Sequence, residues 1–195
     1  MILTPIPADT LEAVLDRFAA LLGDPAAQAV FAAIRTTAAD RAEGAAAERH
    51  RRQAIEMARV RGLPVHPPGT PCRFNWDGVA LDSDTEAYVI LHEIAHFVLA
   101  PPERRALIDF GLGPGPDTTD RTAAERAATV PLIDREGEEA AASLLGILWE
   151  AELGQPALAS FLDQNWLEGM DRSTAAAAHF TAIVGELRRR GVAPG

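Results

Sequence analysis

Cysteine, aromatic residues and long apolar runs are all scarce in this chain. Cys72 is the only cysteine among 195 residues, which excludes an internal disulfide and a cysteine-based zinc site. No run of about 18 uninterrupted apolar residues exists, so no membrane-spanning helix is expected. The first residues contain neither a basic segment nor a long apolar segment, so no signal peptide is expected. We therefore predict a cytoplasmic protein without a membrane partner.

Positive charge is also in short supply. The net charge is -10 and the isoelectric point is near 4.9, so the general field of the protein repels polyanions and we expect no nucleic-acid partner. Alanine is abundant, whereas β-branched and aromatic residues are few, which favours helix over sheet. A hydrophobic fraction of 48% and a charged fraction of 24% are ordinary for a globular protein.

Residues 62–71 break the helical pattern most clearly. This segment contains four prolines, which cannot continue a helix, so an extended connector is expected. It divides the chain into an N-terminal helical segment, 1–62, and a core, 63–195, which we expect to form one compact domain together. Within 72–81, Asp77-Gly78 lies between alternating apolar residues, a pattern typical of a β-hairpin.

An H-E-x-x-H motif lies inside the apolar segment 88–99, which we predict to be a helix. Residues four apart share one helix face, so the imidazoles of His92 and His96 can point at a single metal ion. Glu93 is placed to take a proton from water bound to that ion, or to hydrogen-bond a ligand. The competing interpretation is two neutral core histidines, but polar groups in a buried helix cost free energy unless they are paired. We therefore predict a metal-binding helix.

A third ligand is needed because two histidines alone hold a metal ion weakly. A helix is expected over 134–153, and its first turns are rich in acids, which also suit the positive end of a helix. From these acids we predict Glu139 as the third ligand, with Glu138 as the alternate. Such a set leaves open positions on one ion, and it fits both the zinc site of metallopeptidases and the Fe(II) site of non-haem oxygenases. The other histidines are expected to pack in the fold or face solvent: His50, His66 and His179.

The segment from His92 to Pro156 resembles the elongation factor P hydroxylase family, bacterial enzymes that hydroxylate a modified lysine of that translation factor. The order and approximate spacing of several short motifs agree with the family, and an Arg-Arg pair followed by Asp-Phe-Gly is more specific than H-E-x-x-H alone. The matching segments are the helix 92–97, Arg104-Arg105, Leu107-Ile-Asp-Phe-Gly111, the acidic stretch 136–139, and 148–156.

The resemblance implies a zincin-like fold that binds one divalent ion through the three ligands named above, with Fe(II) favoured and Zn(II) as the alternative. It also implies catalytic roles for Glu93, Arg105 and Asp109. Together with the composition, it predicts a mainly α fold with a small β-hairpin (α+β), organised as a single domain around the metal-binding helix.

Three functions compete. The first is an iron-dependent hydroxylase that acts on a lysine side chain of a protein, with elongation factor P as the partner by resemblance. Because the chain itself is acidic, binding an acidic partner would then need a local basic patch, at Arg104-Arg105 or in the region Arg49–Arg52. The second is a zinc-dependent metallopeptidase or hydrolase, in which Glu93 takes a proton from zinc-bound water. The third is a non-catalytic helical binding module whose metal is structural or absent.

Overall fold

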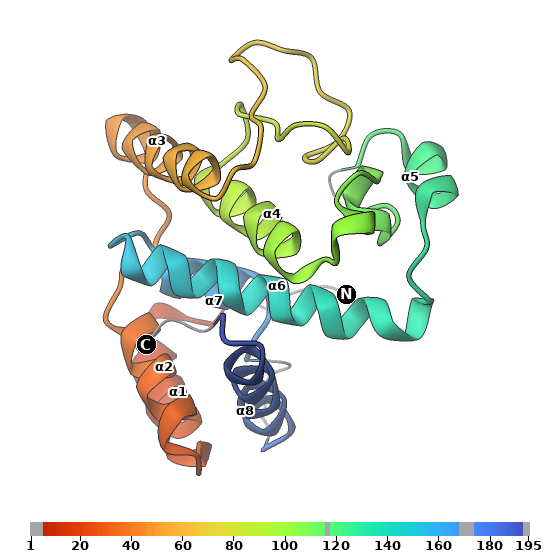
Figure 1. The fold of residues 1–195 in the computed structure, drawn as a ribbon. Helices are drawn as coiled ribbons and strands as arrows, with labels where there is room; N and C mark the ends of the chain where they lie inside the picture. The colour runs from red at the N-terminus through yellow and green to blue at the C-terminus, as the bar shows by residue number, and fades with distance from the viewer. Residues whose placement is uncertain (1–5, 116–117, 168–173, 193–195) are drawn as a thin grey trace. The chain divides into compact units, whose positions relative to one another are not determined.

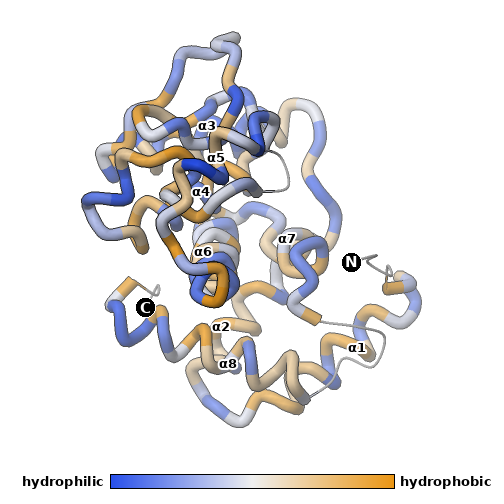
Figure 2. Tube along the Cα trace, turned by 90° about the vertical axis from the view of Figure 1, so that its right-hand side faces the viewer, coloured by the Kyte–Doolittle hydropathy of each residue, from blue (hydrophilic) through white to orange (hydrophobic). Residues whose placement is uncertain are grey.

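The computed structural model describes residues 6–115, 118–167 and 174–192. Within these ranges the chain is mainly helical, as predicted, with eight α-helices and two short 3-10 helices (Figure 1). Hydrophobic and hydrophilic residues alternate every few positions along the helices (Figure 2), as expected for helices that bury one face. None of the described helices is both long enough and apolar enough to cross a membrane.

Contacts between residues divide the chain into two compact units. The first combines residues up to 42 with residues from 147 onward, and the second consists of residues 43–146. The boundary predicted at residue 62 falls inside the second unit, because α3 (Gly44–Val60) makes its main contacts with α4 (Ala87–Leu99). The last helix of the predicted N-terminal segment therefore belongs to the unit that carries the motif.

A cluster of phenylalanine rings forms the centre of the first unit. The rings of Phe18, Phe31, Phe161 and Phe180 are fully buried, and their centroids lie 4.9 to 6.3 Å apart. Most pairs meet edge to face, which adds a favourable electrostatic contribution to the burial of the rings. The helices that supply this core are α1 (Ala8–Leu21), α2 (Pro25–Arg35), α7 (Ala157–Asp163) and α8 (Thr174–Arg189).

Helix α4 carries the motif and is buried along most of its length. Ile90, Leu91 and Ile94 are fully buried, and the two polar side chains Glu93 and His96 are only 7% and 3% exposed. The helix ends at Leu99, the last residue of the predicted helix, and the prolines at 101 and 102 prevent its continuation. The other elements of the second unit are η1 (Pro102–Arg104), η2 (Ile108–Gly111), α5 (Arg121–Ala127) and the first part of α6 (Leu132–Glu152).

Gly146 allows α6 to approach the backbone of α4 closely. A Cβ atom at this position would lie 3.2 Å from the amide nitrogen of His92 and 3.3 Å from its Cα, which is tighter than most real contacts. Glu139 precedes Gly146 by two helical turns, so both residues lie on the same face of α6. The close approach therefore presents Glu139 to the histidines of α4.

The predicted hairpin at 72–81 is reduced to isolated bridges. Trp76 and Leu81 form one antiparallel bridge, Val65 and Leu81 form one parallel bridge, and the described part of the chain contains no longer strand. Asp77 closes the turn between Trp76 and Leu81, because its carboxylate accepts hydrogen bonds from the backbone amides of Val79 and Ala80. One pair of residues on each side of a turn is too few to form a stable ladder.

Candidate metal centre

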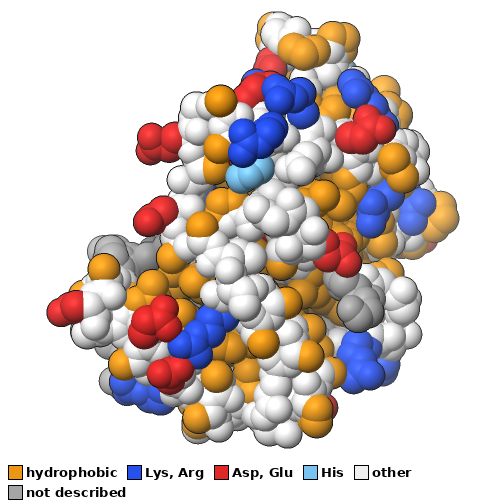
Figure 3. Space-filling model, turned by 90° about the vertical axis from the view of Figure 1, so that its left-hand side faces the viewer, with side chains coloured by type: hydrophobic (Ala, Val, Ile, Leu, Met, Phe, Trp, Pro, Cys, Tyr) orange, Lys and Arg blue, Asp and Glu red, His pale blue; other side chains and the backbone are white. Residues whose placement is uncertain are grey.

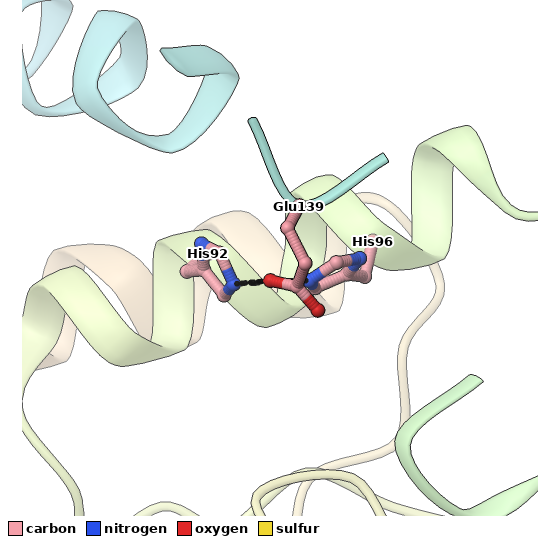
Figure 4. Close-up of side chains that lie close together, drawn as sticks. All are labelled: His92, His96 and Glu139. Atoms are coloured by element: carbon pink, nitrogen blue, oxygen red, sulfur yellow. Dashed lines mark hydrogen bonds and ion pairs between the residues drawn. The ribbon is translucent and has the colours of Figure 1, made fainter. Parts of the chain in front are cut away.

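Three side chains converge on one point in the second unit: His92 and His96 from α4, and Glu139 from α6 (Figure 4). The Nε2 atoms of the two histidines are 2.9 Å apart, and each lies 3.4 Å from Oε2 of Glu139. Within the described ranges, these residues form the one group of three possible ligands whose ligand atoms all lie within 4.8 Å of one another. The structure therefore brings together the three residues that the sequence predicts as ligands.

The spacing of these three atoms suits a divalent ion. A triangle with these sides lies on a circle of radius about 1.9 Å, so a point about 2.1 Å from all three atoms exists just outside its plane. Bonds from zinc to histidine nitrogen and carboxylate oxygen have about this length. Without an ion, the two rings share a hydrogen bond of 2.9 Å, and Nε2 of each ring stays in electrostatic contact with Oε2 of Glu139 at 3.4 Å.

One side of the cluster is open. The His96 side chain is 4% exposed, whereas the His92 side chain is 24% and the Glu139 side chain 49% exposed. The buried ring of His96 thus forms the inner wall, and solvent reaches the cluster past His92 and Glu139. A group bound between the three ligand atoms would keep contact with solvent, as a catalytic metal requires.

The charges of the cluster are strongly coupled. Burial opposes the charged form of His96, but the carboxylates of Glu139 and Glu138 outweigh it and raise the pKa of His96 to about 10. Burial also opposes ionisation of Glu139, yet His96 and His92 hold the pKa of that carboxyl well below its usual range. The protein groups thus place a cationic ring beside an ionised carboxylate, and a divalent cation that binds here must displace the ring's proton.

Glu138, the alternate third ligand, faces the other nitrogen of His96. Its Oε1 atom lies 3.9 Å from Nδ1 of His96, and Oε2 accepts a hydrogen bond of 2.6 Å from Nη2 of Arg104. Burial raises the pKa of Glu138, but His96 and Arg104 outweigh it, so the net shift is downward. Because consecutive helical residues point in different directions, Glu139 meets the outer nitrogens of the rings while Glu138 lies behind His96.

Of the two adjacent arginines, the structure turns Arg104 towards the cluster and Arg105 away from it. Arg104 donates to Glu138 and, through Nη1, to the carbonyl of Phe110 at 3.1 Å. Arg105, which was predicted to be catalytic, lies over the ring of Phe97 at 4.5 Å and donates to the carbonyl of Ala100. The sequence pair alone could not distinguish them, because their directions depend on the turn of η1.

Glu93 lies inside the unit and is not one of the three converging ligands. Its side chain accepts a long hydrogen bond of 3.5 Å from the amide of Asn75. Burial raises the pKa of Glu93, while His96 and His92 act in the opposite direction. A carboxyl in this environment holds a proton at a higher pH than a surface carboxyl, so the chemistry predicted for Glu93 is compatible with its position.

Asp109 and Phe110 adopt an unusual backbone conformation next to the cluster. Their φ angles are 46° and 53°, in the left-handed region that residues other than glycine rarely occupy. The turn places the Phe110 ring on the ring of His96, with centroids 5.6 Å apart. Burial raises the pKa of Asp109 to about 6, although the hydroxyl of Thr118 donates to its carboxylate and lowers it in part. A strained backbone conformation of this kind persists only where the surrounding contacts hold it in place.

The candidate basic patch on α3 is interspersed with acids. Arg51 and Arg52 both pair with Glu48, and Arg59 pairs with Glu56 at 3.8 Å. Basic and acidic side chains are also interspersed on the face shown in Figure 3. The charge available to an acidic partner is therefore smaller than the number of arginines in this region indicates.

The remaining histidines of the chain lie outside the ligand cluster. Nε2 of His66 lies 2.8 Å from the carboxylate of Asp77, and the His179 ring stacks on Trp166 with centroids 5.5 Å apart. The third, His50, is half-buried on α3, and burial lowers its pKa, with the charge of Arg49 acting in the same direction. None of the three belongs to the converging ligand group.

Comparisons with known proteins add no family to this geometry. The chain matches no protein-family model, and no curated protein or solved structure matches it either. The interpretation of the site therefore rests on its own residues, their distances and their charges.

Proposed function

We propose that this chain is a metal-dependent enzyme that hydroxylates a side chain of a protein substrate at one divalent ion, Fe(II). The observation that carries the proposal is the convergence of His92, His96 and Glu139 with one side open to solvent. A two-histidine, one-carboxylate set is the ligand set of non-haem Fe(II) oxygenases, and it leaves positions for dioxygen and substrate. We also propose that α4 and α6 form the centre of a zincin-like arrangement.

The chain's own groups supply proton handling around the ligands. Hydroxylation puts one oxygen atom of dioxygen into a C–H bond and releases the other as water, so it needs two protons and two electrons from an external reductant such as ascorbate. Burial raises the pKa of Glu93 and brings that of Asp109 to about 6. Either carboxyl can therefore hold a proton where a surface carboxylate could not.

The choice of reaction and substrate rests on resemblance. The Arg-Arg and Asp-Phe-Gly motifs, which resemble the elongation factor P hydroxylase family, lie in the segment that forms η1 and η2 beside the ligands. We infer that the substrate is a lysine side chain on a protein of the elongation factor P type.

The test begins with metal analysis of protein purified without oxygen. The Fe(II) form is then incubated with dioxygen, ascorbate and candidate proteins, and we expect a mass gain of one oxygen atom on a lysine-containing peptide. Glu139→Gln should lose both the metal and the activity, whereas Glu136→Gln, an exposed acid on the same helix, should keep both. Stoichiometric iron without any hydroxylated candidate would contradict the proposed substrate, and a chain that binds no metal would contradict the whole proposal.

A zinc hydrolase is the second candidate, and the buried Glu93 favours it. In the H-E-x-x-H hydrolases this glutamate takes a proton from zinc-bound water, and a carboxyl with a raised pKa suits that task. Tightly bound native zinc, together with casein cleavage that Glu93→Gln abolishes, would establish this function in place of the hydroxylase. A metal-loaded protein without either activity would instead favour the binding module.

A further inference from the structure

On the side of His96 that faces away from the cluster, two buried polar atoms lie opposite each other, and neither has a hydrogen-bond partner. They are Nδ1 of His96 and Oε1 of Glu138, which lie 3.9 Å apart. A buried donor or acceptor without a partner costs free energy, so a pair of such atoms in one place calls for an explanation. The pair needs only a small movement to close to hydrogen-bond length.

Metal binding supplies a reason for that hydrogen bond. When Nε2 of a histidine binds a metal ion, the proton of the neutral ring lies on Nδ1 and needs an acceptor. For His96 that acceptor is Oε1 of Glu138, because the other carboxylate oxygen is already bound by Arg104 at 2.6 Å. The arrangement therefore selects the ring form that binds a metal through Nε2.

Arg104 holds this arrangement from two sides. Its Nη2 binds Glu138, and its Nη1 donates to the carbonyl of Phe110, whose ring stacks on His96. The side chains of Arg104 and Glu138 are 14% and 15% exposed, so the ion pair is well shielded from water. One guanidinium thus fixes both the carboxylate behind the ring and the aromatic ring beside it.

We propose that Glu138 and Arg104 are positioning residues that fix the orientation and proton position of His96 for metal binding. This inference rests on the metal site of the proposed function and adds to it a pair of residues outside the ligand set. Removal of a partner behind a metal-binding histidine typically weakens metal binding by about 10- to 100-fold. The same range is expected here for Glu138→Gln.

Glu138→Gln is informative because its amide has two unlike ends. Arg104 offers only donors, so the glutamine must turn its oxygen towards Arg104 and its NH2 group towards Nδ1 of His96. That orientation favours the wrong ring form, in which Nδ1 accepts and Nε2 carries the proton. Replacing Arg104 by methionine in the same protein releases the amide, which can then turn its oxygen to His96.

The experiment measures Zn(II) affinity by competition with a chromophoric chelator for wild type, Glu138→Gln, Arg104→Met, the double variant and Glu136→Gln. We expect a loss of about 10- to 100-fold for each of the first two single variants and little change for Glu136→Gln. The double variant should bind no more weakly than Glu138→Gln. In Zn(II)-loaded wild type, long-range proton–nitrogen NMR spectra should show the proton of His96 on Nδ1.

The possible results separate this inference from the proposed function. Equal Zn(II) affinity of Glu138→Gln and Glu136→Gln would overturn the positioning role, and so would single losses that multiply in the double variant. A wild-type chain that binds Zn(II) but hydroxylates nothing would contradict only the proposed reaction. A wild-type chain that binds no metal would overturn both. Arg104→Lys, which keeps the charge, serves as a second variant if Arg104→Met unfolds, and it should recover part of the affinity.

Discussion

Replacing Gly146 by alanine tests whether the close approach of α6 to α4 holds Glu139 over the histidines. The added Cβ would lie 3.2 Å from the amide nitrogen of His92 and 3.4 Å from the carbonyl carbon of Leu91. These are backbone atoms, which cannot rotate away as the end of a side chain can. The two helices must therefore separate by a few tenths of an ångström to admit the methyl group.

The expected size of the effect follows from two opposing contributions. Alanine in a helix interior is about 1 kcal/mol more favourable than glycine, whereas overpacking a tight contact typically costs about 1–3 kcal/mol. The net change for Gly146→Ala is thus a loss of about 0–2 kcal/mol in the free energy of unfolding. Gly137 lies in the same helix with nothing within 4 Å of an added Cβ, so Gly137→Ala should gain about 1 kcal/mol.

Urea unfolding followed by circular dichroism measures the stability, and chelator competition measures Zn(II) affinity. Metal–ligand distances tolerate only about 0.2 Å of change, so a shift of α6 should weaken Zn(II) binding by about tenfold in Gly146→Ala. Gly137→Ala should leave the affinity unchanged. If Gly146→Ala gained as much stability as Gly137→Ala and bound Zn(II) as tightly as wild type, the close approach would have no role in placing Glu139.

Three further predictions concern a buried carboxyl, the two histidines of the cluster and a tight turn. Burial raises the pKa of the Glu150 carboxyl from 4.5 to about 7. The protonated carboxyl therefore contributes its full stability below pH 4.5, and this contribution is lost as the pH rises through 7. In urea unfolding, Glu150→Gln should be more stable than wild type by about 3 kcal/mol at pH 8 and nearly equal to it at pH 4. His92→Ala and His96→Ala should each remove most of the bound metal in elemental analysis, and full occupancy in either variant would show that the ligand assignment is wrong. Gly78→Ala should lose more than about 1 kcal/mol in thermal unfolding, because φ is +90° there and the added Cβ would lie 2.7 Å from the carbonyl oxygen of Ala106; unchanged stability would contradict the tight turn.

The ligand cluster was accessible to sequence reasoning because its main features are local. His92 and His96 are one helical turn apart, so their common direction follows from helix geometry. Glu139 lies in another helix, and it could be chosen only because a metal site needs a third ligand and the acids before the apolar part of α6 could supply one. The mainly helical fold followed from composition, because alanine is abundant and β-branched and aromatic residues are few.

The residues that surround the three predicted ligands could not be predicted from the sequence in this way. The direction of Arg104 depends on η1, and the position of the Phe110 ring depends on the consecutive left-handed residues Asp109 and Phe110. Aspartate enters this region more often than most residues, but phenylalanine rarely does, so the pair does not follow from local propensity. Arg104, and not the predicted Arg105, contacts Glu138 and the carbonyl of Phe110. Similarly, alternating apolar residues around Asp77-Gly78 predicted strands, but the Trp76 side chain instead stacks on Phe110 with centroids 5.3 Å apart. Tertiary packing decided each of these cases.

The second unit is inserted between the two sequence segments of the first, and this order has a consequence for synthesis on the ribosome. The aromatic core of the first unit needs Phe161 and Phe180, which are made after every residue of the second unit. The second unit is complete once Gly146 has left the exit tunnel, and by then His92 and Glu139 are both available. The candidate metal centre can therefore assemble on a nascent chain in which α1 and α2 still lack the aromatic partners from α7 and α8.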